Sequence, residues 1–159
     1  MIKKKFQSNS VEDTASIGCM IGKNLLGGEV IELQSDLGGG KTTFVGGLAR
    51  GLGSDDPVAS PSFTLNYIYR CKGDKRLSHF DFYRLDDAGI LSNELAEVLE
   101  DPQTVVAVEW GDIVHDVLPE KRIKVNITAN GDAKRVITCL YPKEFDYLFK
   151  SIIIPESKG

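Results

Sequence analysis

Several features that define common classes of protein are absent from this sequence. No stretch approaches the about 18 consecutive apolar residues of a membrane-spanning helix. Cys19, Cys71 and Cys139 lie far apart and form no C-x-x-C pair, so we expect neither a disulfide framework nor a zinc site on sulfur. The lysines at positions 3–5 are followed by polar residues rather than by the apolar run of a secretory signal. We therefore expect a cytoplasmic protein without a membrane anchor.

An excess of positive charge is absent as well. The chain has 19 Lys and Arg against 23 Asp and Glu, a formal net charge of −4, and its basic residues are scattered along the sequence. Proteins that bind a nucleic-acid backbone directly usually present a concentrated basic surface. The composition therefore argues against direct binding to DNA or RNA.

The residues that are present describe an ordinary folded domain. Apolar residues make up 42% and charged residues 26% of the 159, which excludes disorder caused by low hydrophobicity. This length suits one hydrophobic core. Because no repeat, low-complexity stretch or linker interrupts the chain, we expect a single domain over residues 1–159.

Hydrophobic periodicity alternates between helix and strand along the chain. Apolar residues at spacings of three and four predict helices over 11–26, 41–52 and 87–100. β-rich or continuous apolar runs predict strands over 30–33, 63–69, 76–82, 105–108, 123–127 and 136–140. The segment EFDYLFKSIII, residues 144–154, is compatible with a helix or an extended arm. The pattern predicts an α/β fold whose mixed sheet has a parallel centre and antiparallel margins.

The stretch SDLGGGKTTF, residues 35–44, resembles a phosphate-binding loop placed between a strand and a helix. Its glycines allow backbone N–H groups to approach a phosphate closely, and the start of the helix adds partial positive charge. This predicts a three-layer P-loop NTPase-like domain. The residues expected to bind the nucleotide are Asp36, Leu37, Gly38, Gly39, Gly40, Lys41, Thr42 and Thr43.

Three side chains of this loop have distinct expected roles. Lys41 would reach the terminal phosphates, the Thr42 hydroxyl would bind Mg²⁺, and Thr43 would contact an earlier phosphate. The first position of the motif is Ser35 instead of Gly. Serine can follow the turn if its φ stays negative, so this difference alters the entrance to the loop rather than the groups that contact phosphate.

Two glycines, Gly46 and Gly47, lie inside the helix that follows the loop. Each lowers helix stability by about 1 kcal/mol relative to alanine. Close packing of the helix on the sheet is one explanation for their presence.

A Mg²⁺-dependent nucleotide site also needs an acidic residue opposite Thr42, commonly at the end of a strand. Asp81 in HFDFYR and Glu109 in VVAVEWGD each end a β-rich run. Glu109 follows four apolar residues, so its charge requires a ligand, a partner or solvent at the carboxyl edge of the sheet. It would either hold Mg²⁺ through water or orient the attacking water.

Other polar and aromatic residues near these acids have two interpretations each. Trp110 is either a core residue or an anchor in a protein interface. Tyr83 and Arg84 belong either to a structural ion pair or to a cationic site near the phosphates. His79 is most simply a packed strand residue, and we assign it no chemistry.

Four segments together resemble the TsaE family, the bacterial ATPases of tRNA threonylcarbamoyladenosine biosynthesis. They are SDLGGGKTTF, SPSFTL (residues 60–65), HFDFYRL (residues 79–85) and VEWGD (residues 108–112), and the resemblance extends over about residues 6–140. The usual family loop is Gly-Asp-Leu-Gly-Ala-Gly-Lys-Thr, so Ser35 and Gly39 depart from it while Lys41 and Thr42 are kept.

The resemblance implies a catalyst that works with partners. TsaE proteins act on a complex of TsaB and TsaD, where ATP binding and hydrolysis allow turnover while TsaD modifies the adenosine next to the anticodon. It implies that Asp81 is the Mg²⁺ ligand and Glu109 the second essential acid. SPSFTL resembles a nucleotide-responsive switch in which Ser60 and Thr64 contact the γ-phosphate or the metal.

Other functions use the same loop. A small-molecule kinase usually has an arginine-rich lid, and no such insertion is visible. A GTP switch needs a guanine-binding Asn-Lys-x-Asp motif, which does not occur, so ATP is preferred. A binding module with an inactive loop would rest on Ser35 alone, and Lys41 and Thr42 argue against it.

Overall fold

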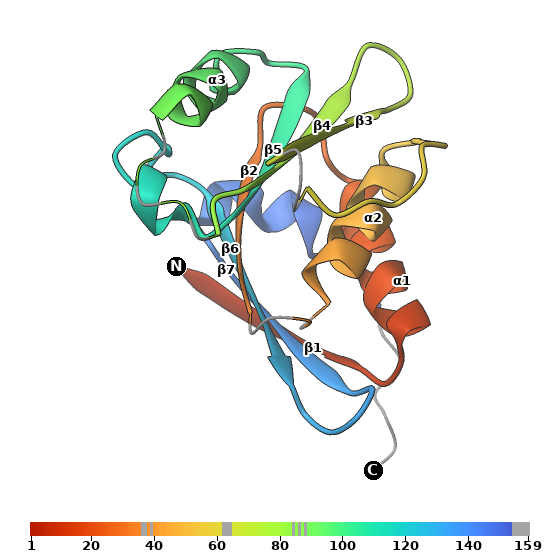
Figure 1. Cartoon of the computed structure of the whole chain (residues 1–159). Helices are drawn as coiled ribbons and strands as arrows, with labels where there is room; N and C mark the ends of the chain where they lie inside the picture. Colours follow the sequence, from red (N-terminus) through yellow and green to blue (C-terminus); the bar gives the residue numbers. More distant parts are fainter. Residues whose placement is uncertain are drawn as a thin grey trace.

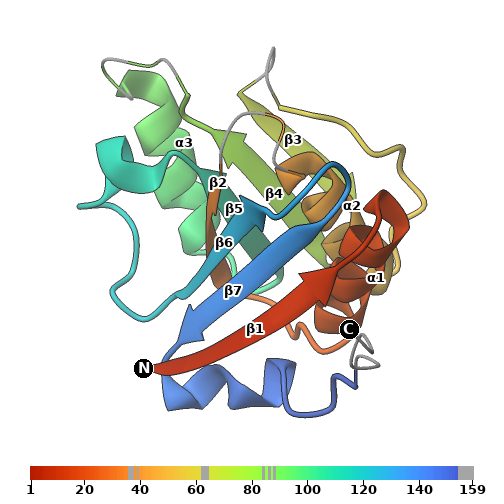
Figure 2. The same ribbon diagram turned by 90° about the horizontal axis from the view of Figure 1, so that it is seen from below.

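A seven-stranded mixed sheet forms the middle layer of the protein, in the strand order β1-β7-β6-β2-β5-β4-β3. The structure is a computed structural model that describes residues 1–35, 38, 40–61, 65–83, 85, 87 and 89–153. Helices α1 and α2 cover one face of the sheet, and α3 covers the other (Figure 1; Figure 2). This three-layer arrangement confirms the predicted α/β fold.

The described elements follow the predicted order with shifted ends. The strands are β1 Ile2–Ser8, β2 Val30–Ser35, β3 Asn66–Arg70, β4 Arg76–Asp81, β5 Thr104–Glu109, β6 Ile123–Ala129 and β7 Arg135–Tyr141. The α-helices are α1 Val11–Gly22, α2 Lys41–Gly51 and α3 Gly89–Leu99. Two 3-10 helices are η1 Gly111–Val114 and η2 Lys143–Leu148. In the described part of the chain no helix is both long and apolar enough to cross a membrane.

The pairing of the strands confirms a parallel centre with antiparallel margins. β2 is parallel to both β5 and β6, and β4 is parallel to β5. β7 pairs antiparallel with β1 and β6, and β3 pairs antiparallel with β4. The carboxyl ends of β2, β4 and β5 therefore lie at one edge of the sheet.

Alternating side chains of the central strands fill a separate apolar cluster on each face. Ile31 and Leu33 of β2 join the cluster beneath α1 and α2, while Val30 joins the one beneath α3. All six residues of β5 are buried. Complete burial explains why this strand appears as a continuous apolar run in the sequence rather than as an alternating one.

Helices α1 and α2 pack in backbone contact through glycines. A Cβ added to Gly47 would overlap the carbonyl oxygen of Ala15, and one added to Gly22 would overlap that of Leu48. Gly46 lies under the side chain of Val58, which is 2.7 Å from the position of an added Cβ. The suggestion that Gly46 and Gly47 pack on the sheet is therefore wrong, because Gly47 faces α1 and Gly46 faces a loop.

The amino-terminal strand was not predicted from the sequence. In β1 the exposed side chains of Lys3, Lys5 and Gln7 alternate with partly buried ones, and the strand pairs with β7 along its whole length. Three consecutive lysines conceal this alternation, because Lys4 occupies a partly buried position. The predicted cap of α1 is confirmed, since the Asp13 N–H donates to Ser10 Oγ at 3.0 Å.

The helical alternative for residues 144–154 is confirmed in part, because Lys143–Leu148 forms the 3-10 helix η2, which packs back onto the domain. The Tyr147 hydroxyl donates to Glu29 Oε2 at 2.7 Å, and Asn24 Nδ2 donates to the Leu148 carbonyl at 3.0 Å. Asn24 therefore lies in the turn after α1, where its side chain binds η2. Helix α1 ends at Gly22, four residues earlier than predicted.

The α1–α2 contact predicts an unusual effect for Gly47→Ala. In an exposed helix this change would stabilise by about 1 kcal/mol. Here we expect a loss of about 1–3 kcal/mol, because the added methyl group forces the two helices apart. Chemical denaturation measures this change in the free energy of unfolding, with Ser16→Ala on the exposed side of α1 as the control. A stabilised Gly47→Ala variant would contradict the close packing.

Candidate functional site

The predicted charged residues meet at the carboxyl edge of the parallel strands. Glu109 ends β5 and is the register partner of Leu33 on β2 and of Asp81 on β4. Lys41 begins α2, which follows the loop leaving β2. Asp81 lies close enough to Glu109 and to Lys41 for the charges of both to affect its pKa.

The described part of the phosphate loop has the backbone expected from its glycines. Gly38 and Gly40 have φ values of 75° and 102°, and Gly40 is the N-cap of α2. Ser35 pairs with Ile127 of β6 as a regular strand residue and is not among the described residues with positive φ. The condition for accepting serine at this position is therefore met. Three predicted nucleotide-binding residues lie outside the described residues: Asp36, Leu37 and Gly39.

Lys41 holds a nearly buried ammonium group at this edge. The residue is 8% exposed, and its Nζ makes no ion pair with any described residue. The Nζ atom lies 5.3 Å from the centre of the Trp110 ring, a distance suited to a cation–π contact. Thr42 and Thr43 follow in the first turn of α2 and are half-buried.

The carboxylate of Asp81 is also buried, at 8% exposure of the residue. Its Oδ1 accepts a hydrogen bond from the Tyr83 N–H at 2.9 Å. Burial raises the pKa of Asp81, and the neighbouring charge of Glu109 raises it further. The Tyr83 hydrogen bond, His79 and Lys41 oppose that rise without cancelling it. A cation bound here would stabilise the ionised carboxylate and so lower the pKa of Asp81.

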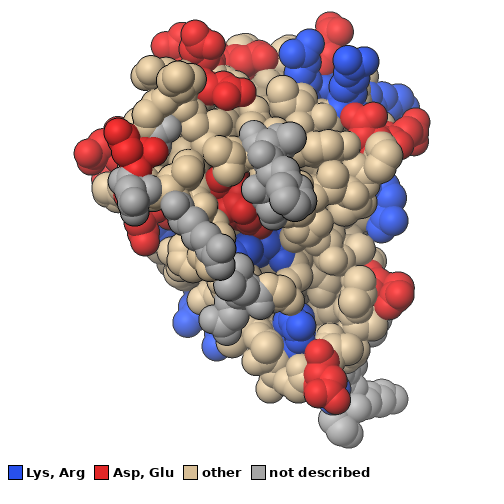
Figure 3. Space-filling model, in the orientation of Figure 1, with Lys and Arg blue, Asp and Glu red and all other residues tan. Residues whose placement is uncertain are grey.

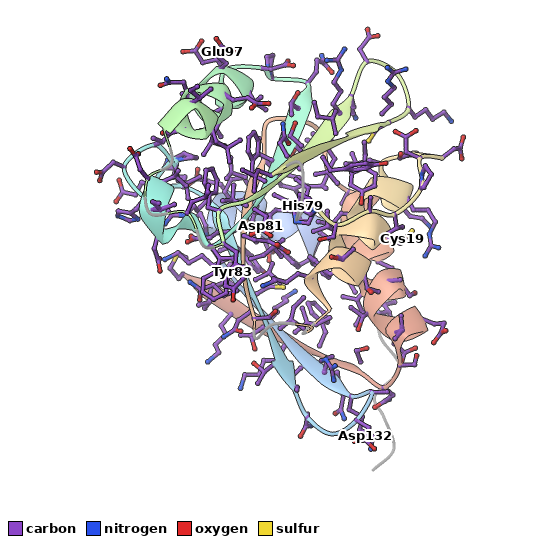
Figure 4. All side chains as sticks on the ribbon, in the orientation of Figure 1. Cys19, His79, Asp81, Tyr83, Glu97 and Asp132 are labelled. Atoms are coloured by element: carbon purple, nitrogen blue, oxygen red, sulfur yellow. The ribbon has the colours of Figure 1, made fainter. Side chains whose placement is uncertain are left out.

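Sequence reasoning missed His79 as part of the site. The residue is completely buried, and its Nε2 lies 3.3 Å from Glu109 Oε1. The contact is close but does not have hydrogen-bond geometry, and neither ring nitrogen has a hydrogen-bond partner among the residues that the structure describes. Figure 4 shows His79, Asp81 and Tyr83 following one another along the end of β4. The motif HFDFY places a histidine two residues before the acid on the same side of a strand, and this spacing was the available signal.

Trp110 covers Lys41 from the side of β5. Its backbone is left-handed, with φ 58°, and its ring is 5.0 Å from that of Tyr83. Because the residue is 41% exposed, the core interpretation is wrong. A small cavity of about 190 Å³ lies beside it. Its lining residues are Leu33, Gln34, Ser35, Lys41, Trp110, Gly111 and Asp112.

The switch-like segment SPSFTL is only partly described. Ser60 is exposed, whereas Thr64 and also Arg84 lie outside the described residues. Leu65 ends the segment with a left-handed φ of 63°, and its carbonyl accepts from the Asp81 N–H at 2.9 Å. The end of this segment is thus tied to the strand that carries the acid.

A second, larger hollow of about 430 Å³ lies along α2. Thr43, Gly46, Gly47 and Arg50 line one side at helical spacing. Residues 54–56 and Val58 line the other side. The hollow continues from the residue expected to contact an early phosphate.

The described residues include no group of three or more His, Cys, Asp or Glu able to hold a metal ion. A closed all-protein metal cage is therefore absent from the described part of the chain. The residues predicted to bind Mg²⁺ are instead Asp81 at the end of β4, Glu109 at the end of β5 and Thr42 in the first turn of α2. Mg²⁺ usually binds to one or two carboxylates and completes its shell with substrate phosphates and water, so the residues present fit this ion.

Surface charge is less evenly distributed than the sequence indicates. Figure 3 shows basic side chains around the β3–β4 hairpin and acidic ones over α3. The exposed basic residues include Arg70, Lys72 and Arg76, and those of the acidic helix include Glu94 and Glu97. The hairpin is a local basic group on a protein of net negative charge.

Comparison with known proteins identifies the same family that the motifs resemble. The family model of "Threonylcarbamoyl adenosine biosynthesis protein TsaE" matches residues 8–137. A protein of Treponema pallidum named tRNA threonylcarbamoyladenosine biosynthesis protein TsaE is 38% identical over 131 residues, covering 82% of this chain and 96% of its own. The protein of that name from Bacillus subtilis is 36% identical over 139 residues, covering 87% and 85%.

A solved structure has the same fold. The crystal structure of Bacillus subtilis YdiB matches with a TM-score of 0.76 and 32% identity, covering 92% of this chain and 91% of that one. The family model and the similar relatives each extend over most of the chain, including all four motifs. This chain therefore belongs to the TsaE family.

Proposed function

We propose that this protein is a Mg²⁺-dependent ATPase that acts in the biosynthesis of threonylcarbamoyladenosine in tRNA. The observation that carries the proposal is the meeting of Lys41, Asp81 and Glu109 at one sheet edge, beside a strand–loop–helix of phosphate-binding type. The pathway follows from the names of the similar relatives.

Phosphate binding would use the amino-terminal end of α2. The left-handed Gly40 directs the chain into the helix, and the first N–H groups of α2 are free of intrahelical partners. Lys41 would exchange its contact with the Trp110 ring for a phosphate oxygen, a stronger charge-assisted contact. The hollow beside Thr43 supports a nucleotide rather than a bare phosphate, because about 430 Å³ accommodates a nucleoside.

The two acids would divide the remaining work. Asp81 and Thr42 would hold Mg²⁺, and the ion would neutralise charge that develops on the phosphates. Glu109 would orient the attacking water and accept its proton. His79 would fix the direction of the Glu109 carboxylate, since their side chains are 3.3 Å apart in a buried setting.

Partner proteins of the TsaB and TsaD families complete the proposal. Trp110 is exposed beside the site, so a protein docked there would contact the residue that covers Lys41. The strained Leu65 links SPSFTL to the backbone of Asp81, which offers a route from metal binding to a surface segment. ATP turnover governed by partners, with tRNA contacted only through them, fits this layout.

Reconstitution of tRNA modification tests the proposal. Under multiple turnover with TsaB, TsaD, tRNA and ATP, we expect omission of this protein to stop the reaction. Lys41→Ala and Glu109→Gln should lower ATP hydrolysis by roughly a hundredfold or more, because the first removes the cation that binds the phosphates and the second the carboxylate that orients the attacking water. Lys134→Ala, on the exposed β6–β7 turn, is the control. Full modification by the Lys41 variant would exclude this mechanism.

Asp81→Asn should stabilise the nucleotide-free protein while abolishing hydrolysis. The folded state raises the pKa of Asp81, so ionisation of this carboxyl destabilises the fold as pH rises through the interval above its ordinary value of 3.8. We expect the variant to have the higher Tm at pH 7. The difference should shrink as the pH falls towards 3.8, because the folded wild-type carboxyl takes up its proton above that value. Saturating Mg²⁺ and ATP should reverse the order. A variant with a lower Tm at pH 7 would contradict the conclusion that the ionised Asp81 carboxylate destabilises the fold.

Ser35→Gly should change nucleotide affinity without changing the mechanism. Glycine loosens the entrance of the loop, whereas the groups that contact phosphate are unchanged. We expect a change of roughly threefold in the Kd for ADP, measured by calorimetry, with kcat within about twofold of wild type. If hydrolysis appeared only in the glycine variant, Ser35 would have to be regarded as an inactivating substitution.

A further inference from the structure

An ion pair is buried beneath the strand that enters the phosphate loop. Arg122 Nε lies 2.7 Å from Glu32 Oε2, and the two side chains are 6% and 5% exposed. Glu32 is in the middle of β2, where its neighbours Ile31 and Leu33 are core residues. A buried ion pair is often no more stabilising than apolar residues of similar size, so stability alone does not account for it.

The pair contacts the segment of residues 111–122 at several points. Arg122 donates through one terminal nitrogen to the Pro119 carbonyl at 2.9 Å, and its other terminal nitrogen is 3.5 Å from His115 Nδ1. Glu32 Oε1 lies so close to Gly111 that a Cβ there would be 3.0 Å away. The forked guanidinium and the two carboxylate oxygens thus join β2 to both ends of this segment.

The same segment follows directly after the functional residues of β5. Gly111, which lies next to the Glu32 carboxylate, is the neighbour of Trp110, whose backbone is left-handed and whose ring lies over Lys41. Glu109 precedes Trp110 in the chain. A shift of η1 away from β2 would therefore displace both residues relative to the phosphate loop, although neither contacts the ion pair.

We propose that Glu32 and Arg122 are positioning residues of the nucleotide site. Their ion pair fixes η1 against β2, and so holds the Trp110 ring over Lys41 and the Glu109 carboxylate at the edge of the sheet. The forked contacts of arginine with both β2 and the 111–122 segment supply the geometry that an apolar pair would lack. This inference rests on the proposed ATPase function for its kinetic consequences.

The decisive variant replaces the pair by apolar residues of similar volume, Glu32→Leu with Arg122→Met. We expect it to unfold cooperatively with a Tm at or above that of the wild type, because a buried pair is replaced by apolar packing. We expect kcat for ATP hydrolysis to fall roughly tenfold to a hundredfold through misplacement of Glu109. KM should change by less than about threefold, because the phosphate loop itself is intact.

Trp110 gives a readout that does not depend on hydrolysis. It is the single tryptophan of the chain, so the emission of the free protein reports its surroundings directly. In the double variant we expect a shifted emission maximum and increased quenching by acrylamide. Lys121→Ala is the matched control, because it breaks the adjacent but exposed ion pair of 3.2 Å with Glu144. That variant should resemble the wild type in Tm, kinetics and emission.

The outcomes separate the two proposals. A folded double variant with wild-type kcat and wild-type Trp110 emission would overturn the positioning role and leave a structural one. If the wild type failed to hydrolyse ATP while the double variant still shifted Trp110, the ATPase proposal would fail and the positioning of Trp110 would stand. Should the double variant not fold, Arg122→Lys, which keeps the charge but loses the fork, decides by the same two measurements.

Discussion

The parallel pairing of β4, β5 and β2 is the constraint on which the site depends. It brings three strand ends to one edge, so that residues separated by up to 74 positions, Ser35 and Glu109, lie close together. Register then decides which side chains meet, since Asp81 and Glu109 are direct partners. A slip of one residue between β4 and β5 would turn one carboxylate to the opposite face.

Three charged groups, Lys41, Asp81 and Glu109, are each at most 8% exposed at this edge. The charges of these groups do not fully neutralise one another. The pKa of Asp81 is raised, and the Lys41 ammonium group contacts an aromatic ring instead of a carboxylate. Groups held in this way are already desolvated before any ligand arrives. A bound anion and a bound cation would each remove part of the imbalance, which couples occupancy of the site to stability of the fold.

Sequence reasoning found what local chemistry determines and missed what depends on contact across the fold. Lys41 was identified from the phosphate-loop motif, and the two acids because each ends a β-rich run. His79 was dismissed because its proximity to Glu109 arises only from the pairing of β4 with β5. The ion pair of Glu32 with Arg122 joins residues 90 positions apart, and no local pattern marks it. Gly46 and Gly47 were noticed, but identifying the surface against which each packs required the position of α1.

Because α1 and α2 are in backbone contact, the two sides of the phosphate loop differ in stiffness. Helices that touch through glycines have no layer of side chains between them that can repack, so α1 and α2 behave as one stiff body. On the side of β4 and β5, in contrast, Leu65 and Trp110 have left-handed backbone. Displacement produced by a nucleotide would therefore be taken up on the β4–β5 side, and the surface there, rather than α1, would present the state of the site to another molecule.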